Sequence, residues 1–150
     1  KIKVDSTSGK SLKTVALVNT GFETLKPQLL LPIKAASDLS IWPNLPTEVK
    51  IEIYDTAGGP MRVYIVPDSA WVSLLVEEQD SENRKAKPSV SEANILSDMV
   101  ISHTEVEVLI SDKLAGRLKV AIEDAGEGIW RFRDDSPDEK RKSELPEYWT

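Results

Sequence analysis

Residues 48–66 read EVKIEIYDTAGGPMRVYIV, and this stretch decides the fold class. Apolar Val49, Ile51 and Ile53 alternate with charged side chains, which is the two-residue period of a half-buried β-strand. A second apolar stretch at 61–66 follows residues 55–60, which contain two glycines and a proline. The pattern predicts a β-hairpin with its turn at 55–60.

Short apolar runs of the same kind recur on both sides of this hairpin. Upstream, strands are expected at 10–18 and 29–31, and Pro32 is expected to open a short helix over 33–40. Downstream, strands are expected at 71–76, within 94–109, at 119–122 and at 129–132, with a short helix over 112–118. The chain is therefore predicted to be mostly β, with one or two short helices.

Two segments are polar and charged. Residues 77–91 are nearly free of large apolar side chains and are expected to form a mobile loop or insertion. Residues 134–150 are rich in charge and contain Pro137 and Pro146. They are expected to form a charged C-terminal tail with little fixed structure, except where Tyr148 and Trp149 dock. The folded domain is expected to span residues 1–133.

The composition excludes several kinds of chemistry. The 150 residues include no Cys and one His, His103, which argues against disulfides, thiolate nucleophiles and zinc sites, so no metal or cofactor is expected. The formal net charge of -6 argues against a nucleic-acid partner. With no apolar run near the ~20 residues of a membrane span and no signal-peptide pattern, we expect no membrane partner and a cytoplasmic location.

One further stretch carries recognisable chemistry. Residues 14–24 read TVALVNTGFET, an apolar strand followed by Asn19-Thr20-Gly21. It resembles the active-site segment of the retropepsin-like aspartic proteases, the family of the retroviral proteases, where Asp-Thr-Gly or Asp-Ser-Gly follows such a strand. The resemblance, closest to microbial and perhaps archaeal members, covers roughly residues 10–132. The 48–66 hairpin falls at the family's flap, and Ser111 stands where a Gly usually precedes a short helix.

The resemblance implies a fold, a site and a partner. The fold would be a closed barrel forming half of an acid protease, with the active site at a homodimer interface, because one motif supplies one carboxylate. Asn19 would occupy the position of the catalytic Asp, beside Thr20 and Gly21. The substrate would be a polypeptide held under the flap, whose expected binding residues are Tyr54, Asp55, Thr56, Ala57, Gly58, Gly59 and Met61.

The residue at the Asp position separates two hypotheses. Asn is nearly isosteric with Asp but cannot ionise, so it preserves the geometry and removes the general base. We expect an aspartic endopeptidase subunit captured as an inactive Asp-to-Asn variant at Asn19. The alternative is a natural non-catalytic pseudoprotease that acts as a peptide-binding or assembly dimer. A third interpretation, an unrelated β-barrel domain, would be favoured by a monomeric chain.

Overall fold

The computed structural model describes residues 1–19, 21–79 and 86–150, without the side chains of residues 78–79 and 86–88. Strand accounts for 49% of the structure and helix for 9%, in two short segments, which confirms the mostly-β prediction. The strands are β1 (Ile2–Ser6), β2 (Ser11–Thr14), β3 (Ala16–Val18), β4 (Gln28–Pro32), β5 (Lys50–Thr56), β6 (Gly59–Gln79), β7 (Ala86–Val90), β8 (Ile95–Ser102), β9 (Val108–Ile110), β10 (Val120–Asp124), β11 (Ile129–Phe132) and β12 (Arg141–Lys142). The helices are α1 (Ile33–Asp38) and α2 (Asp112–Arg117).

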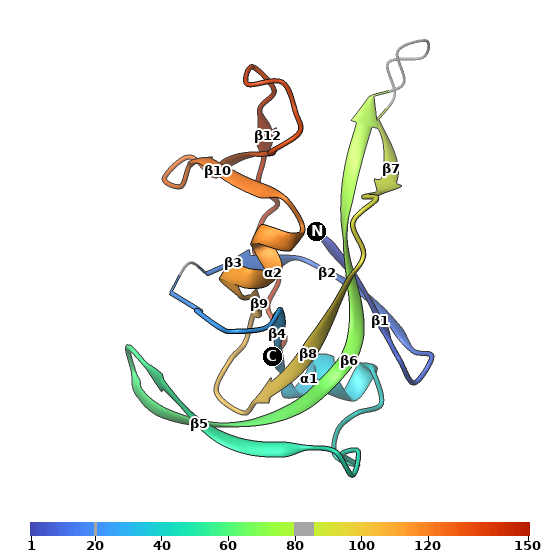
Figure 1. The fold of residues 1–150 in the computed structure, drawn as a ribbon, viewed down its shortest axis with the longest axis vertical. Helices are drawn as coiled ribbons and strands as arrows, with labels where there is room; N and C mark the ends of the chain where they lie inside the picture. Colours follow the sequence, from blue (N-terminus) through green and yellow to red (C-terminus); the bar gives the residue numbers. More distant parts are fainter. Residues whose placement is uncertain (20, 80–85) are drawn as a thin grey trace.

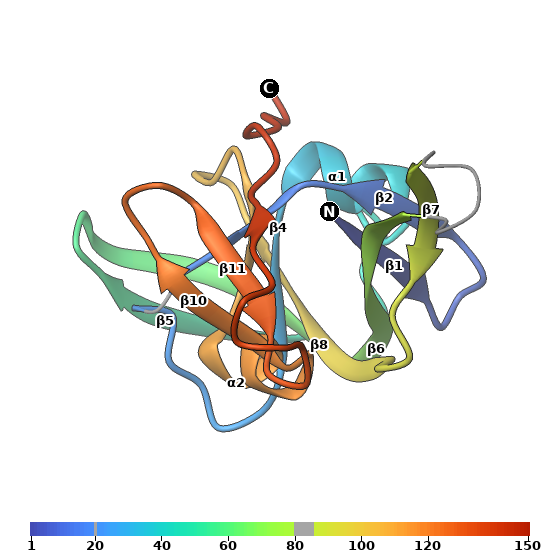
Figure 2. The same cartoon turned by 90° about the horizontal axis from the view of Figure 1, so that it is seen from above.

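The main sheet is a curled half-barrel built around the long strand β6 (Figure 1). Its strand order is β2-β1-β6-β8-β4-β9-β3, and β5 and β7 pair with opposite ends of β6. The strands β10, β11 and β12 form a separate small sheet. Figure 2 shows this small sheet and the β6–β7 hairpin on opposite sides of the N-terminus.

The two ends of the main sheet come from one stretch of chain, residues 11–18. The two ends of the strand order are β2 and β3, and no pairing joins them. The sequence pattern predicted one strand over 10–18, but the chain breaks at Val15, so that β2 pairs with β1 and β3 pairs with β9. Because β2 and β3 follow each other directly, this one stretch of chain pairs with both β1 and β9 and connects the two ends of the strand order.

Strand β9 lies between β3 and β4, although β3 and β4 are neighbours in the sequence. β9 pairs in parallel with β3, where Val18 lies opposite Ile110, and antiparallel with β4, where Leu29 also lies opposite Ile110. The connection over residues 19–27 therefore passes around the end of β9. Both ends of that connection are fixed by the same strand, which gives the loop a rigid base.

The apolar run of β4 is explained by burial on both faces. Leu29 and Leu31 belong to the main core cluster with Met99, while Leu30 belongs to a smaller cluster with Val100. The smaller cluster lies under the β5–β6 hairpin and also contains Val63, Ile65 and Leu109, with Phe22, Tyr54 and Met61 packed against it. A central strand with both faces covered reads as a continuous apolar run, which is the pattern seen here.

The predicted central hairpin is confirmed, with differences in extent. β5 and β6 pair in register from Lys50 opposite Ile65 to Thr56 opposite Gly59, so the turn is tighter than residues 55–60. β6 also continues past Val66 to include the strand predicted at 71–76, with a register shift between Val66 and Ala70. Asp68 lies at this irregularity with a φ of 45°.

The prediction of a loop over 77–91 is wrong for residues 77–79 and 86–90, which are strand. Residues 77–79 and 86–90 pair as β6 and β7, because backbone hydrogen bonds can hold a hairpin whose side chains are polar. Residues 80–85 of the predicted loop lie outside the described residues. Composition alone therefore misled the prediction at this segment.

The expectation of little fixed structure in the tail is also wrong. β12 pairs with β11, and the Arg141 guanidinium lies 2.9 Å from the Asp135 carboxylate. Trp149 docks as expected, since its indole Nε1 donates to Thr14 Oγ1 at 3.0 Å. Tyr148 is 61% exposed and does not dock. These contacts with distant parts of the chain give the tail a defined structure, although its charged composition predicted exposure to solvent.

The two expected helices and the late hairpin are confirmed, whereas the β pattern expected within 94–109 is divided into β8 and β9 by residues 103–107. Pro32 is the N-cap of α1, Ser111 is the N-cap of α2, and β10 and β11 form the expected late hairpin. None of the described helices has the length and apolar character needed to cross a bilayer.

Candidate active site

Asn19 begins a tight turn directly after β3. Its side-chain Oδ1 accepts a hydrogen bond from the Gly21 backbone N–H at 3.0 Å, and its backbone carbonyl accepts from Phe22 N–H at 3.0 Å. Asn19 is half-buried, whereas Gly21 is exposed. Thr20, the middle residue of the predicted motif, lies outside the described residues. The turn fixes one oxygen of the residue 19 side chain against the backbone.

The loop after Asn19 is fastened to the start of α2. The Asp112 backbone N–H donates to the Phe22 carbonyl at 2.9 Å, and the Asp112 carboxylate accepts from Thr24 N–H at 3.1 Å. Helix α2 itself packs against β4 and β10, so it is a firm support. The position of Asn19 is therefore set by elements from both halves of the chain.

Ser111 connects this support to β4. Its fully buried hydroxyl oxygen accepts from Leu114 N–H at 3.2 Å, which caps α2, and from Gln28 N–H at 3.0 Å, at the start of β4. The Ser111 N–H in turn donates to the Gln28 carbonyl at 3.0 Å. Ser111, which stands where the family resemblance places a Gly, thus supplies an acceptor to two buried backbone N–H groups.

Tyr54 and Met61 lie opposite each other on the inner face of the β5–β6 hairpin. The Tyr54 hydroxyl donates to Gln28 Oε1 at 2.7 Å, and its ring centroid lies 6.4 Å from that of Phe22. Burial raises the pKa of the Tyr54 hydroxyl, and the hydrogen bond to Gln28 opposes that shift in part. The Met61 sulfur accepts from Ser102 Oγ at 3.1 Å.

The tip of the hairpin is an exposed turn held by its own residues. Thr56 Oγ1 donates to the Gly59 carbonyl at 2.7 Å and accepts from Gly58 N–H at 3.2 Å. Gly59 has a φ of +107°, a conformation that favours glycine. Asp55 and Ala57 are also exposed. The tip has the shape of a small rigid loop that projects from the molecule, as Figure 1 shows at the free end of β5.

An open cleft of about 420 Å³ separates the Asn19 loop from the hairpin. It is lined by Gly21, Phe22, Glu23, Thr24, Leu25, Lys26, Gln28, Glu52, Ile53, Tyr54 and Asp55. The structure therefore brings Gly21 together with Tyr54 and Asp55 across one cleft. The other predicted flap residues, Thr56, Ala57, Gly58, Gly59 and Met61, do not line it.

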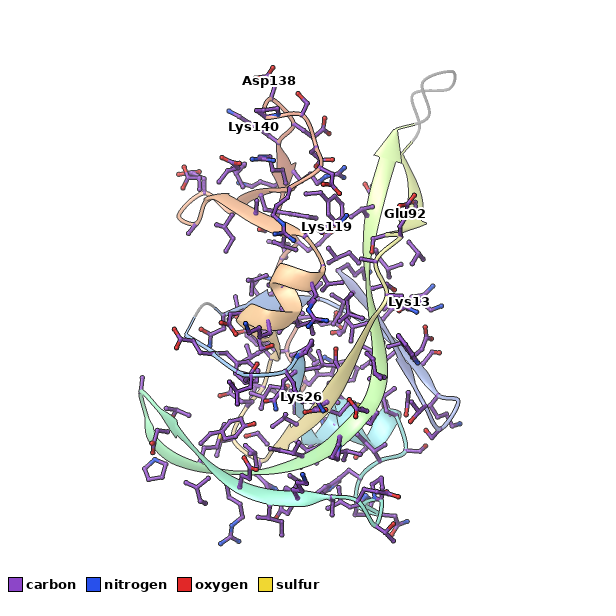
Figure 3. The ribbon with its side chains drawn as sticks, viewed as in Figure 1. Lys13, Lys26, Glu92, Lys119, Asp138 and Lys140 are labelled. Carbon is purple, nitrogen blue, oxygen red and sulfur yellow. The ribbon has the colours of Figure 1, made fainter. Side chains whose placement is uncertain are left out.

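A polar network behind the cleft was missed by the sequence reasoning. The Lys26 ammonium, labelled near the middle of Figure 3, lies 3.0 Å from Asp98 Oδ1 and 3.1 Å from Asp68 Oδ1. Hydrogen bonds to Asp98 and then Asp68 raise the pKa of Lys26. The Asp98 carboxylate is 5% exposed and also accepts from Asp68 N–H at 2.8 Å. An acid inside the apolar stretch of β8 is the signal that could have revealed this network.

A larger groove of about 940 Å³ lies between the small sheet and the strands β1, β3 and β6. Leu17 and Ile122, which line it, are 48% and 44% exposed. No group of three or more His, Asp or Glu able to hold a metal ion occurs within the described ranges 1–19, 21–79 and 86–150.

No protein-family model and no curated protein matches this chain. The functional interpretation accordingly depends on the residues around Asn19 and on their geometry.

Proposed function

We propose that the chain is one subunit of a retropepsin-like aspartic endopeptidase, with Asn19 at the position of the catalytic aspartate. The observation that carries the proposal is the placement of Asn19. Its side-chain oxygen is held by Gly21 N–H at 3.0 Å, in a loop fastened to α2, and residues 21–26 of that loop border one cleft together with Tyr54 of the hairpin. A strand, a tight turn and a covering hairpin are the parts that the family resemblance calls for.

An aspartate at position 19 would use the same turn. Gly21 N–H would hold one carboxylate oxygen and leave the other for water and substrate. A second copy of the chain, related by a two-fold axis, would supply the second carboxylate. Two adjacent carboxylates share one proton, so one activates the attacking water as a base while the other protonates the peptide carbonyl as an acid.

A peptide substrate would enter the cleft between the Asn19 loop and the hairpin. An extended peptide can pair its backbone with a hairpin as an added strand, which positions the scissile bond without a cofactor. The cleft wall carries the acidic side chains Glu23, Glu52 and Asp55. A basic side chain in the substrate would complement them.

The proposal is tested by restoring the acid with Asn19→Asp. The variant is assayed against a peptide library, with basic and acidic members, at acidic and near-neutral pH. Asn44→Asp, the same chemical change at an exposed site, is the matched control. We expect cleavage by Asn19→Asp and none by the parent or the control. A folded, dimeric Asn19→Asp protein, verified by sedimentation, that cleaves nothing would refute the proposal.

The alternative is a natural non-catalytic dimer that binds peptides or builds an assembly. Asn19 itself favours it, because the amide oxygen fully satisfies the Gly21 N–H without any charge. Peptide binding by the parent chain is expected under both hypotheses. Cleavage by Asn19→Asp is what separates them.

A further inference from the structure

A chain of three side chains runs from the hairpin to the interior of the sheet. The Tyr54 hydroxyl donates to Gln28 Oε1 at 2.7 Å, and Gln28 Nε2 donates to Asp98 Oδ2 at 3.4 Å. Gln28 is buried at the start of β4, and Asp98 is buried in β8. These contacts join the hairpin to two central strands of the sheet.

The direction of the Gln28 amide is set by Asp98. A carboxylate accepts hydrogen bonds and does not donate them, so it orients the amide nitrogen toward itself and the amide oxygen toward Tyr54. The buried Asp98 carboxylate is bound by the Lys26 ammonium at 3.0 Å and by the Asp68 backbone N–H at 2.8 Å. Asp98 thus decides which Gln28 atom faces Tyr54.

The same contacts fix the height of the hairpin above the Asn19 loop. The Tyr54 ring lies against Phe22, which follows the Asn19 turn, and the Phe22 carbonyl is bound by α2. Farther along the hairpin, β6 pairs with β8 from Val63 onward, so its base is part of the sheet. The segment from Tyr54 to Met61 lacks that pairing. It contacts the rest of the molecule through Tyr54 and through the Met61 sulfur, which accepts from Ser102 Oγ at 3.1 Å and from Thr104 Oγ1 at 3.2 Å.

We propose that Tyr54, Gln28 and Asp98 form a flap latch, in which Gln28 is a positioning residue that holds the hairpin closed and Asp98 orients its amide. Opening the cleft to a peptide breaks the Tyr54–Gln28 hydrogen bond. Because the latch would regulate access to the candidate active site, this inference rests on the proposed function. Its geometry can nevertheless be measured without any catalytic activity.

The experiment measures the distance from the hairpin tip to α2. Because the chain has no Cys, Ala57→Cys and Lys113→Cys, both at exposed positions, introduce two unique sites for spin labels. Pulsed electron double resonance then gives the distribution of distances between the labels. Labelled chains are diluted in excess unlabelled chain, so that distances between two copies do not contribute.

Four variants are compared in this labelled background. Tyr54→Phe removes the hydroxyl and keeps the ring, whereas Gln28→Met removes both amide groups at similar length. Asp98→Asn places an amide where Gln28 Nε2 needs an acceptor, which favours the reversed Gln28 orientation. Tyr64→Phe is the matched control, because Tyr64 lies on the opposite face of the hairpin and packs against Trp42.

We expect Tyr54→Phe and Gln28→Met to raise the open population about fivefold, the effect of losing one ordinary hydrogen bond. Asp98→Asn should also raise the open population, and Tyr64→Phe should have the same open population as the parent. Parent-like distances in Tyr54→Phe would overturn the latch. Parent-like distances in a folded Asp98→Asn protein would overturn the orienting role of Asp98. If Asp98→Asn does not fold, Gln28→Met still decides whether the latch exists.

The two proposals fail in different ways. An Asn19→Asp protein without cleavage refutes the protease and leaves the label distances unaffected. Unchanged distances with active Asn19→Asp protein refute the latch alone. In an active protein, Tyr54→Phe is further expected to change KM more than kcat, because it alters access to the cleft and not the reacting groups.

Discussion

Removing the Ser111 hydroxyl tests whether one buried side chain supports the candidate site. Ser111→Ala leaves the Leu114 N–H at the start of α2 and the Gln28 N–H at the start of β4 without their acceptor. Ser111 is fully buried, so we expect no water to replace the lost oxygen. Both donors belong to elements that hold the Asn19 loop or the flap latch.

The size of the effect follows from those two contacts. Loss of an N-cap serine costs about 1 kcal/mol. A buried N–H left without a partner costs about 1–3 kcal/mol more. The free energy of unfolding should therefore fall by about 2–4 kcal/mol, which lowers Tm by about 5–15 °C in a domain of this size.

Urea and thermal denaturation of Ser111→Ala, followed by circular dichroism, measure this change. Ser37→Ala is the matched control, since the Ser37 hydroxyl bonds to Ile33 within α1 at an exposed position. Its stability should stay within about 0.5 kcal/mol of the parent. Equal stability losses in the two variants would refute the role assigned to Ser111.

Three further predictions concern the tail and the hairpin tip. Hydrogen bonding to Arg141 lowers the pKa of Asp135. This pair therefore stabilises the fold above about pH 4, and its contribution is lost as the pH falls through the lowered pKa. In urea titrations, the difference in the free energy of unfolding between the parent and Asp135→Asn should shrink across that range. Trp149→Phe removes the donor to buried Thr14 and should lower the free energy of unfolding by about 1–2 kcal/mol, whereas an unchanged midpoint would show that the tail contact is not stabilising. Gly59→Ala, at a φ of +107°, should cost about 1 kcal/mol or more, and Gly58→Ala, its neighbour without that conformation, should cost less in the same melts.

Features that depend on neighbouring residues were predictable from the sequence. The alternation in β5 predicted the hairpin, Pro32 marked the start of α1, and the short apolar runs at 119–122 and 129–132 marked β10 and β11. β1 carries the same kind of signal, with Ile2 and Val4 alternating with polar residues, but it was not among the predicted strands. Local period and turn chemistry were sufficient for these elements.

Features that depend on sheet order could not be read in this way. The break at Val15 exists because the two halves of one apolar run pair with different strands, and Val15 N–H takes its acceptor from Glu147 near the end of the chain. The contact between Gln28 and Asp98 arises because β4 and β8 become parallel neighbours. No local pattern specifies such partners.

The candidate site was predicted in part for the same reason. The position of Asn19 after a strand followed from the motif, and Tyr54 was expected at the site from the family resemblance. The alternation instead implied burial of Ile51 and Ile53, which are 63% and 59% exposed, because the face of β5 that packs inward is the one that carries Tyr54. The roles of Ser111 and Asp98 required knowing which buried donors and acceptors the fold brings within reach. Polar residues inside apolar strands were the available signal, and they indicate that a partner exists without naming it.

The insertion of β9 between β3 and β4 has a consequence for biosynthesis. A ribosome releases the Asn19 loop early, but the strand that separates its two ends and the helix that fastens it come from residues 108–117, in the last third of the chain. Pairings this distant in sequence form slowly, because the intervening chain must first be ordered. A nascent or truncated polypeptide that lacks residues 108–117 cannot assemble the site, so an active form of this protein would be unable to cut its own growing chain before that segment is made.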